Sequence, residues 1–308
     1  MIAGVGSRMR LVVFLLVIPV AVIAARLVTT ESQTVTKAMA MNGKVVLITG
    51  STDGLGREVA KRVAALGAQV IVHGRNQERG AAVVEEIRRE GKGSARFYAA
   101  DFGSLDQVRT FADQIRRDYS RLDVLVNNAG IWLRERRVSA DGHEMQFAVN
   151  YLAGFLLTRS LLPLLEKSAP SRVVNVASGS QSAIDFTDVM LERPGRAEQG
   201  YAQSKLAQVM FTFDLAAEMQ NKGVLVLTLH PATMMDTTMV RESGLPSQSS
   251  VDEGAQAVMN LIASPDVMNG QFYNGLSPGR ANRQAYDADA RARLRELSLQ
   301  LTSQHTHR

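Results

Sequence analysis

The chain has 308 residues, enough to bury the core of one large domain built from helices and strands. It contains no cysteine, which excludes disulfides, thiolate metal sites and cysteine nucleophiles. Its formal net charge is +5, and more than half of this excess precedes Gly43, so the rest of the chain is not expected to carry a basic face that binds nucleic acid.

Residues 1–28 form an apolar N-terminal segment. Within it, Leu11–Ala25 is apolar throughout and follows two arginines. As a helix this run would span ~22 Å, short of a ~30 Å hydrocarbon core. Two interpretations stay open: a retained membrane anchor, with the following domain facing the cytoplasm, or a signal segment that is cleaved on export. Residues 29–42 are polar and aperiodic, as is typical of a linker, so the folded domain is expected over residues 43–308.

The stretch Lys44–Gly56 joins a short apolar run to a glycine-rich turn. Val45–Ile48 suits a buried parallel strand, and Gly50, Gly54 and Gly56 follow it. A strand, a glycine turn and a helix bind the pyrophosphate of a dinucleotide, because the glycines allow close backbone approach and the helix N-terminus offers unpaired N–H groups. The residues expected to bind the cofactor here are Gly50, Ser51, Thr52, Gly54, Leu55 and Gly56.

The end of the predicted second strand bears on the choice of cofactor. The strand Gln69–His73 is followed by Gly74 and Arg75. In dinucleotide-binding folds an acidic residue near this point binds the 2′-hydroxyl of NAD, whereas an arginine accommodates the 2′-phosphate of NADP. Glycine occupies the acidic position and Arg75 follows, so NADP(H) is favoured and NAD(H) stays possible. Arg57 is a candidate for a second contact to that phosphate.

Helix and strand patterns alternate along the chain. Predicted helices cover Gly54–Gly67, Gln77–Glu90, Ser104–Tyr119 and Phe147–Leu165. Further predicted strands cover Ala95–Ala100, Leu122–Val126 and Arg172–Ala177. Strands that alternate with helices of about ten or more residues predict an α/β fold with a doubly wound parallel sheet.

Three polar residues lie where the cofactor crevice is expected. Ser178 follows the predicted fifth strand, and ligands of such sheets bind beyond the carboxyl ends of the strands. Tyr201 and Lys205 are four residues apart, which places them on one face of a helix. A lysine ammonium near a phenol stabilises the phenolate and lowers the tyrosine pKa from ~10. Tyr201 is therefore a candidate general acid or base.

Together these motifs resemble those of the short-chain dehydrogenase/reductase family. The resemblance covers the chain from Lys44 to about Thr302, and its motifs occur in the family's order: Thr49-Gly50 with Gly54 and Gly56, Asp101, Asn127-Asn128-Ala129-Gly130, Asn150, Ser178, Tyr201 with Lys205, and Pro231. Residues 149–158, 172–178 and 201–208 are most similar to the retinol-dehydrogenase-like and WW-domain-oxidoreductase-like branch. The resemblance implies a single-domain Rossmann fold with a seven-stranded parallel sheet in the order 3-2-1-4-5-6-7. It further implies a helix over Gln199–Asn221 and strands over Val224–Leu229 and Gln271–Asn274.

The resemblance also implies roles for individual side chains. Tyr201 would give a proton to the developing alkoxide, Ser178 would polarise the carbonyl, and Lys205 would lower the tyrosine pKa and bind the nicotinamide ribose. Asn150 would hold a water that links Lys205 to solvent, although it could instead be a satisfied structural asparagine. The remaining cofactor contacts implied are Asp101, Asn128, Ala129, Gly130, Pro231 and Thr237, with Thr233 and Thr238 as alternatives to Thr237.

The expected activity is hydride transfer between NADP(H) and a carbonyl compound or an alcohol. Adaptable apolar side chains dominate the segments expected to surround the substrate, which favours a lipophilic one. They are Trp132, Leu133, Phe186, Met190, Leu191, Met234, Met235 and Met239. The alternative is a non-catalytic NADP(H)-binding redox sensor or scaffold, although the four catalytic positions are all occupied by the family's residues. An epimerase or dehydratase is disfavoured, because those chains carry a different glycine motif and a larger substrate domain.

Other partners are predicted from less distinctive features. No cluster of histidines and carboxylates has metal-ligand spacing, so no metal is predicted. A homodimer is possible, since dimers and tetramers are common in the family. The amphipathic helix expected over Asp287–Leu301 should pack on the domain itself.

Overall fold

The computed structural model describes Met1 and residues 41–303. The predictions for the N-terminal segment, and for the linker up to residue 40, lie outside the described residues. Residues 39–308 group into one unit, and its described part contains all the helices and strands below.

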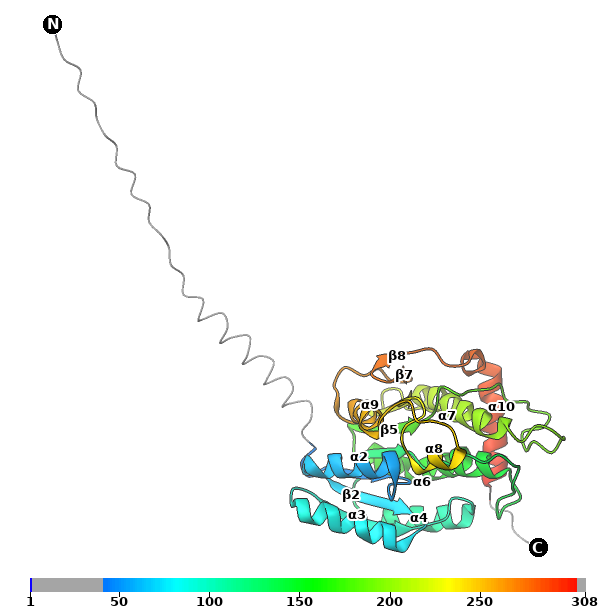
Figure 1. Cartoon of the computed structure of the whole chain (residues 1–308), viewed down its shortest axis with the longest axis horizontal. Coiled ribbons are helices and arrows are strands. Elements are labelled where there is room, and N and C mark those ends of the chain that lie inside the picture. Colours follow the sequence, from blue (N-terminus) through cyan, green and yellow to red (C-terminus); the bar gives the residue numbers. More distant parts are fainter. Residues whose placement is uncertain (2–40, 304–308) are drawn as a thin grey trace. The chain divides into compact units, whose positions relative to one another are not determined.

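Eight strands form one sheet in the order β3-β2-β1-β4-β5-β6-β7-β8 (Figure 1). They are β1 (Val45–Ile48), β2 (Gln69–Gly74), β3 (Ser94–Ala99), β4 (Val124–Asn127), β5 (Ser171–Val176), β6 (Val224–His230), β7 (Phe272–Asn274) and β8 (Ser277–Pro278). The order of the first seven strands and their parallel pairing confirm the prediction. The eighth strand corrects it, because β8 adds an antiparallel edge to β7. Gly275, with φ +59°, allows the tight turn between them.

Helices cover both faces of this sheet. One face packs against α2 (Gly54–Ala65), α3 (Gln77–Glu90) and α9 (Val251–Ala263), and the other against α4 (Leu105–Asp118), α6 (Ala153–Lys167) and α7 (Gln199–Glu218). Strand β1 feeds both cores: Val46 and Ile48 join the first and Leu47 the second. A strand buried on both faces is apolar at every position, as the sequence pattern predicted.

The helix that carries Asn150 differs from the prediction. One helix was expected over Phe147–Leu165, but the structure has α5 (Met145–Phe147), then a π-helical turn η1 (Ala148–Leu152), then α6. A π turn inserts one residue per turn and occurs frequently at functional sites, and here it contains Asn150. The whole span Met145–Lys167 is long and apolar enough to cross a membrane, yet most of it is buried inside the domain, as befits a core helix.

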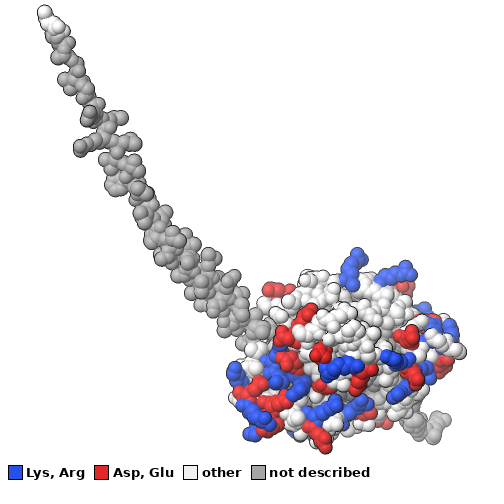
Figure 2. All heavy atoms as spheres, viewed as in Figure 1, with Lys and Arg blue, Asp and Glu red and all other residues white. Residues whose placement is uncertain are grey.

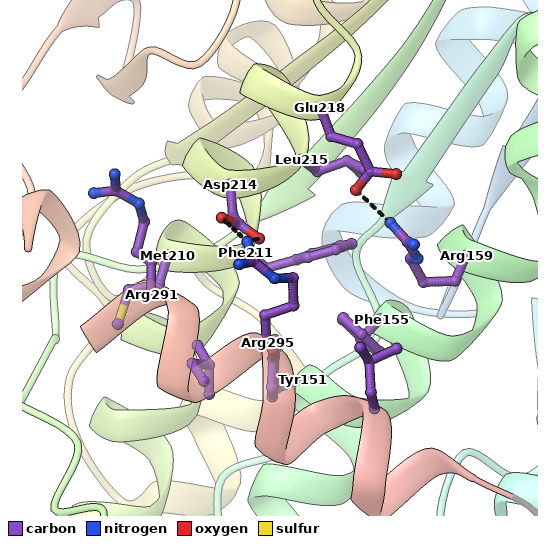
Figure 3. Close-up of a pocket in the computed structure, with 12 residues that line it drawn as sticks. Tyr151, Phe155, Arg159, Met210, Phe211, Asp214, Leu215, Glu218, Arg291 and Arg295 are labelled. Carbon is purple, nitrogen blue, oxygen red and sulfur yellow. Dashed lines mark hydrogen bonds and ion pairs between the residues drawn. The ribbon is translucent and has the colours of Figure 1, made fainter. Parts of the chain in front are cut away.

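The last helix, α10 (Ala288–Thr302), packs on α7, as expected. Its Leu294 is buried in the hydrophobic core on the face of the sheet that packs against α4, α6 and α7. Figure 3 shows two ion pairs beside this contact, Asp214 with Arg295 at 2.6 Å and Glu218 with Arg159 at 2.5 Å. The cavity between these helices measures only about 10 Å³, so it can hold at most about one water molecule.

Candidate active site

The glycine turn after β1 brings backbone segments unusually close together. Gly50 and Gly54 have φ of +63° and +50°, in the region that disfavours other residues. A Cβ on Gly50 would lie 2.8 Å from the Cα of Ala129. A Cβ on Gly56 would overlap both the carbonyl oxygen of Gly50 and the amide of Asn128. The motif glycines are therefore required by close approach, as the spacing predicted.

A side chain of β2 and one just after β4 hold this turn in place. The backbone N–H of Gly50 donates to Nδ1 of His73 at 3.1 Å. The amide of Asn128 donates to the carbonyl oxygens of Thr49 and Gly50, at 2.9 and 3.1 Å. Burial lowers the pKa of His73 to about 3, so this imidazole stays neutral and serves as a fixed acceptor. His73 and Asn128 thus shape the site by hydrogen bonding to its backbone.

Two predicted cofactor residues of the turn direct their side chains into the protein. Ser51 is fully buried, and its hydroxyl donates to the carbonyl oxygen of Ile48 at 2.7 Å and accepts from the N–H of His73 at 3.0 Å. Leu55 is 7% exposed and packs in the core that covers α2. Only their backbones can border a ligand. Thr52 instead packs against Gly74, which has no room for a Cβ beside it.

Arg75 and Asp101 lie together at the carboxyl ends of β2 and β3. The two side chains approach to 3.9 Å, and the Arg75 side chain is 70% exposed. Arg57 forms an ion pair with Glu86 of α3, and its contact to the 2′-phosphate stays a prediction. Of the two arginines, Arg75 is the one that lies at the carboxyl end of β2, largely exposed and loosely paired with Asp101.

Ser178, Tyr201 and Lys205 converge at the carboxyl end of β5. Ser178 comes two residues after this strand, and Tyr201 and Lys205 lie one turn apart in α7. The ammonium nitrogen of Lys205 is 5.6 Å from the centroid of the Tyr201 ring. Burial raises the pKa of Tyr201, while hydrogen bonding by the Ser178 side chain lowers it. The lowered tyrosine pKa expected from the sequence is therefore wrong for this state, because desolvation of the phenolate outweighs the partners present.

Lys205 is held by two acceptors that the motif did not reveal. Its Nζ donates to the carbonyl oxygen of Val176 at 2.9 Å and to Oε1 of Gln208 at 3.0 Å. Both acceptors are neutral, and burial lowers the pKa of Lys205 to about 7. Gln208 lies three residues after the lysine in the same helix, a spacing that brings side chains together and could have signalled the contact.

Asn150 connects the π turn to the catalytic helix. Its Oδ1 accepts from the N–H of Ile131 at 2.7 Å, and its Nδ2 donates to the carbonyl oxygen of Ile131 and to Oγ of Ser204. A Cβ on Gly130 would lie 3.4 Å from Oδ1 of Asn150 and 3.5 Å from Nζ of Lys205. The asparagine is thus satisfied structurally and also borders the same small space as the lysine.

Comparison with known proteins agrees with this geometry. A family model described as short chain dehydrogenase matches residues 44–247. The chain belongs to the short chain dehydrogenase family. It is 35% identical over 289 residues to human retinol dehydrogenase 14, covering 84% of this chain and 86% of that protein. It is 34% identical over 273 residues to mouse retinol dehydrogenase 13, covering 82% of this chain and 81% of that protein.

Solved structures of short chain dehydrogenases share the fold. One from Burkholderia cenocepacia, in complex with NADP, is 26% identical with a TM-score of 0.63, covering 76% of this chain and 97% of that one. An uncharacterized protein from Mycobacterium paratuberculosis is 30% identical with a TM-score of 0.73, covering 87% of this chain and 97% of that one. Recognition of the family from the motifs is therefore confirmed.

The segment after β6 folds against the glycine turn of this dehydrogenase. Pro231 and Ala232 are followed by residues that lead into α8 (Thr238–Ser243), with Thr237 as its N-cap. The methyl group of Thr237 is 3.2 Å from the position of a Cβ on Gly54, and the hydroxyl of Thr238 donates to Asp53 at 2.7 Å. Thr233 instead pairs with His230 at 3.0 Å. Of the three threonines, Thr237 and Thr238 lie at the turn.

Several side chains expected to surround the substrate have other partners. Leu191 is in the core. The sulfur of Met190 accepts from the N–H of Glu144, and Met235 packs tightly against Gly254 of α9. Leu191 therefore does not belong to the predicted apolar wall, whereas Met190 and Met235 stay partly exposed beside these contacts.

Proposed function

We propose that this chain is an NADP(H)-dependent oxidoreductase that interconverts an alcohol and a carbonyl compound. The observation that carries the proposal is the convergence of Ser178, Tyr201 and Lys205 at the carboxyl end of β5, next to a glycine turn that suits a dinucleotide. This position, beyond the carboxyl ends of parallel strands, is where doubly wound folds bind their ligands.

The residues present fit a bound dinucleotide. The glycines let the turn at Gly50, Gly54 and Gly56 pack closely against the segments after β4 and β6. Helix α2 begins there with Asp53 as its N-cap, which accepts from the N–H of Gly54 at 2.8 Å, and the next N–H groups of its first turn are the ones that suit a pyrophosphate. Arg75 supports NADP(H), because its exposed guanidinium suits a 2′-phosphate. Two neighbours, from Burkholderia cenocepacia and Escherichia coli CFT073, are described as complexes with NADP and NADPH. The further cofactor contacts that we propose are Thr52, Asp101, Asn128, Ala129, Gly130, Pro231 and Thr237.

The chain's own groups supply position and a proton. When bound, the nicotinamide donates or accepts the hydride. During reduction, the Tyr201 phenol gives its proton to the carbonyl oxygen as negative charge develops there, and the Ser178 hydroxyl donates a hydrogen bond to the same oxygen. Lys205, as an ammonium, stabilises the phenolate that remains. Asn150 keeps the segment at Ile131 against α7, next to Lys205.

We further propose that the substrate is lipophilic. Support comes from Trp132, Met234 and Met239, which are only partly buried in the segments around the site, and from the retinol dehydrogenases among the relatives. Attachment to a membrane through residues 1–28, with the domain facing the cytoplasm, rests on the composition of that segment alone. Export after cleavage is the competing hypothesis. A homodimer is a separate hypothesis that sedimentation of the purified chain would test.

Turnover by the purified full-length chain tests the function. With NADPH and a panel of aldehydes and ketones, we expect oxidation of NADPH at 340 nm. Tyr201→Phe should lower kcat by about 10²-fold or more and leave the NADPH dissociation constant nearly unchanged, because it removes only the transferable proton. Binding of NADPH without turnover of any compound would favour the sensor or scaffold. Near-full activity of Tyr201→Phe would refute the assigned role.

A further inference from the structure

A cleft of about 490 Å³ opens at the carboxyl ends of β5, β6 and β7. Its lining begins at Gly179, next to Ser178, and continues to Arg280, which follows β8. It also includes Gln181, His230, Asn274 and Asn282. The lining thus reaches the residue next to the proposed catalytic serine, and most of it is polar.

Gln181 ties the two ends of this cleft together. Its Nε2 donates to the carbonyl oxygen of Ser178 at 2.7 Å, and its Oε1 accepts from the N–H of Asn282 at 2.9 Å. The loop that carries Arg280 is thus held by hydrogen bonds to the end of β5.

Arg280 gives the cleft its electrostatic character. The lining contains no aspartate or glutamate, and among residues 41–303 no carboxylate lies within ion-pair distance of Arg280. Its guanidinium carbon is 5.9 Å from the centroid of the Tyr286 ring, so the side chain rests beside an aromatic surface. In Figure 2 the part of the domain over β7 and β8 is mostly uncharged, with basic side chains projecting from it.

The remaining polar side chains of the cleft are neutral, and several already form hydrogen bonds within the protein. His230 pairs with Thr233, and burial lowers the pKa of its imidazole. The side-chain oxygen of Asn282 accepts from the N–H of Gln284 at 3.0 Å. Arg280 is therefore the charged group of the lining, and a planar guanidinium matches a carboxylate in geometry and charge.

We propose that this cleft binds a carboxylate at the far end of the substrate, with Arg280 as its partner. The substrate class is then carbonyl compounds and alcohols that carry an apolar body and a terminal carboxylate. This inference rests on the proposed function and deepens it. The apolar body is the lipophilic part of the proposed function, with Trp132 and Met239 outside the lining of this cleft, and the anionic end is what the cleft adds.

A series of aldehydes tests the inference. Unbranched ω-oxo carboxylic acids of graded length are compared with their methyl esters, using the full-length chain and NADPH. We expect the acid to exceed its ester in kcat/KM by about tenfold at one or more lengths, because a hydrogen-bonded ion pair with Arg280 forms only with the acid. In Arg280→Gln, the ratio of kcat/KM for the acid to that for its ester should fall to about one.

Arg283 provides the matched control. It is exposed, lies three residues after Arg280 and is not part of the cleft lining, so Arg283→Gln removes the same charge from the same region. It should leave the acid-to-ester ratio unchanged, and thermal unfolding should show that both variants are folded. Equal kcat/KM for acids and esters at every length, or equal loss in the two variants, would refute the carboxylate site while leaving the oxidoreductase intact. Failure to turn over either series would overturn both.

Discussion

The contact between Gln208 and Lys205 leads to a quantitative prediction. Gln208 is 3% exposed, and its Oε1 accepts from the lysine ammonium at 3.0 Å. Gln208→Met keeps the length and burial of the side chain but removes that acceptor. A hydrogen bond to a charged group contributes ~1.5–3 kcal/mol, and ~1.4 kcal/mol corresponds to one pKa unit. The Lys205 pKa, about 7 in the structure, should therefore fall by roughly one to two units.

The sign of the shift follows from which form of the lysine is stabilised. Without the acceptor the ammonium form is less stable, so Lys205 loses its proton at a lower pH than in the wild type. Activity that needs the charged lysine is then lost at a correspondingly lower pH. Gln208→Glu places a carboxylate beside the ammonium and should move the same limb of the profile to higher pH. At pH 7 we expect kcat of Gln208→Met to be about tenfold below that of the wild type.

The assay is kcat as a function of pH at saturating NADPH. Gln203→Met is the matched control, because Gln203 is equally buried in α7 but donates to the carbonyl oxygen of Val189. It should leave the position of the pH limb unchanged. The reasoning fails if Gln208→Met has the wild-type profile, or if Gln203→Met moves the limb by the same amount.

Three further predictions concern the cofactor site and stability. Gly56→Ala should destabilise the fold by ~1–3 kcal/mol and weaken NADPH binding, because its methyl group overlaps the Gly50 carbonyl oxygen. Gly154→Ala in α6 is the control: a Cβ there would lie 3.4 Å from its nearest neighbour, so this variant should not lower the melting temperature. Arg75→Gln should raise the NADPH dissociation constant by about tenfold or more without affecting NADH, measured by fluorescence titration; equal weakening of both would contradict the assigned 2′-phosphate contact. Lys205→Met should abolish turnover. The pKa of Lys205 is lowered from 10.5 to about 7 in the folded state. Burying this lysine therefore lowers the free energy of unfolding by the full amount below pH 7, and by less as the pH rises toward 10.5. The stability of the Met variant relative to wild type, from urea unfolding, should thus be greater at pH 6 than at pH 10, by at most ~4 kcal/mol; a pH-independent difference would argue against this account.

Features that depend on neighbouring residues in the chain could be predicted from the sequence. The glycine spacing after Val45–Ile48 predicted a dinucleotide turn, because only glycine tolerates the positive φ and close backbone approach found there. The bounds of α3 were predicted to the residue, since Asn76 caps its start and the left-handed Gly91 ends it. The pairing of Tyr201 with Lys205 was predicted from helical spacing, a short-range property, and from the order in which this motif follows the glycine turn.

Only the tertiary structure decided what depends on distant neighbours. The π turn at Asn150, the added strand β8 and the charge environment of Tyr201 depend on packing and desolvation, which residues far apart in the chain create together. For the same reason the sequence could not show that Leu191, expected near the substrate, is buried in the core, because a leucine has the same composition in either place. Arg280 joins the cleft beside Ser178 only because the chain returns to that edge of the sheet after β8, and no local pattern encodes that return.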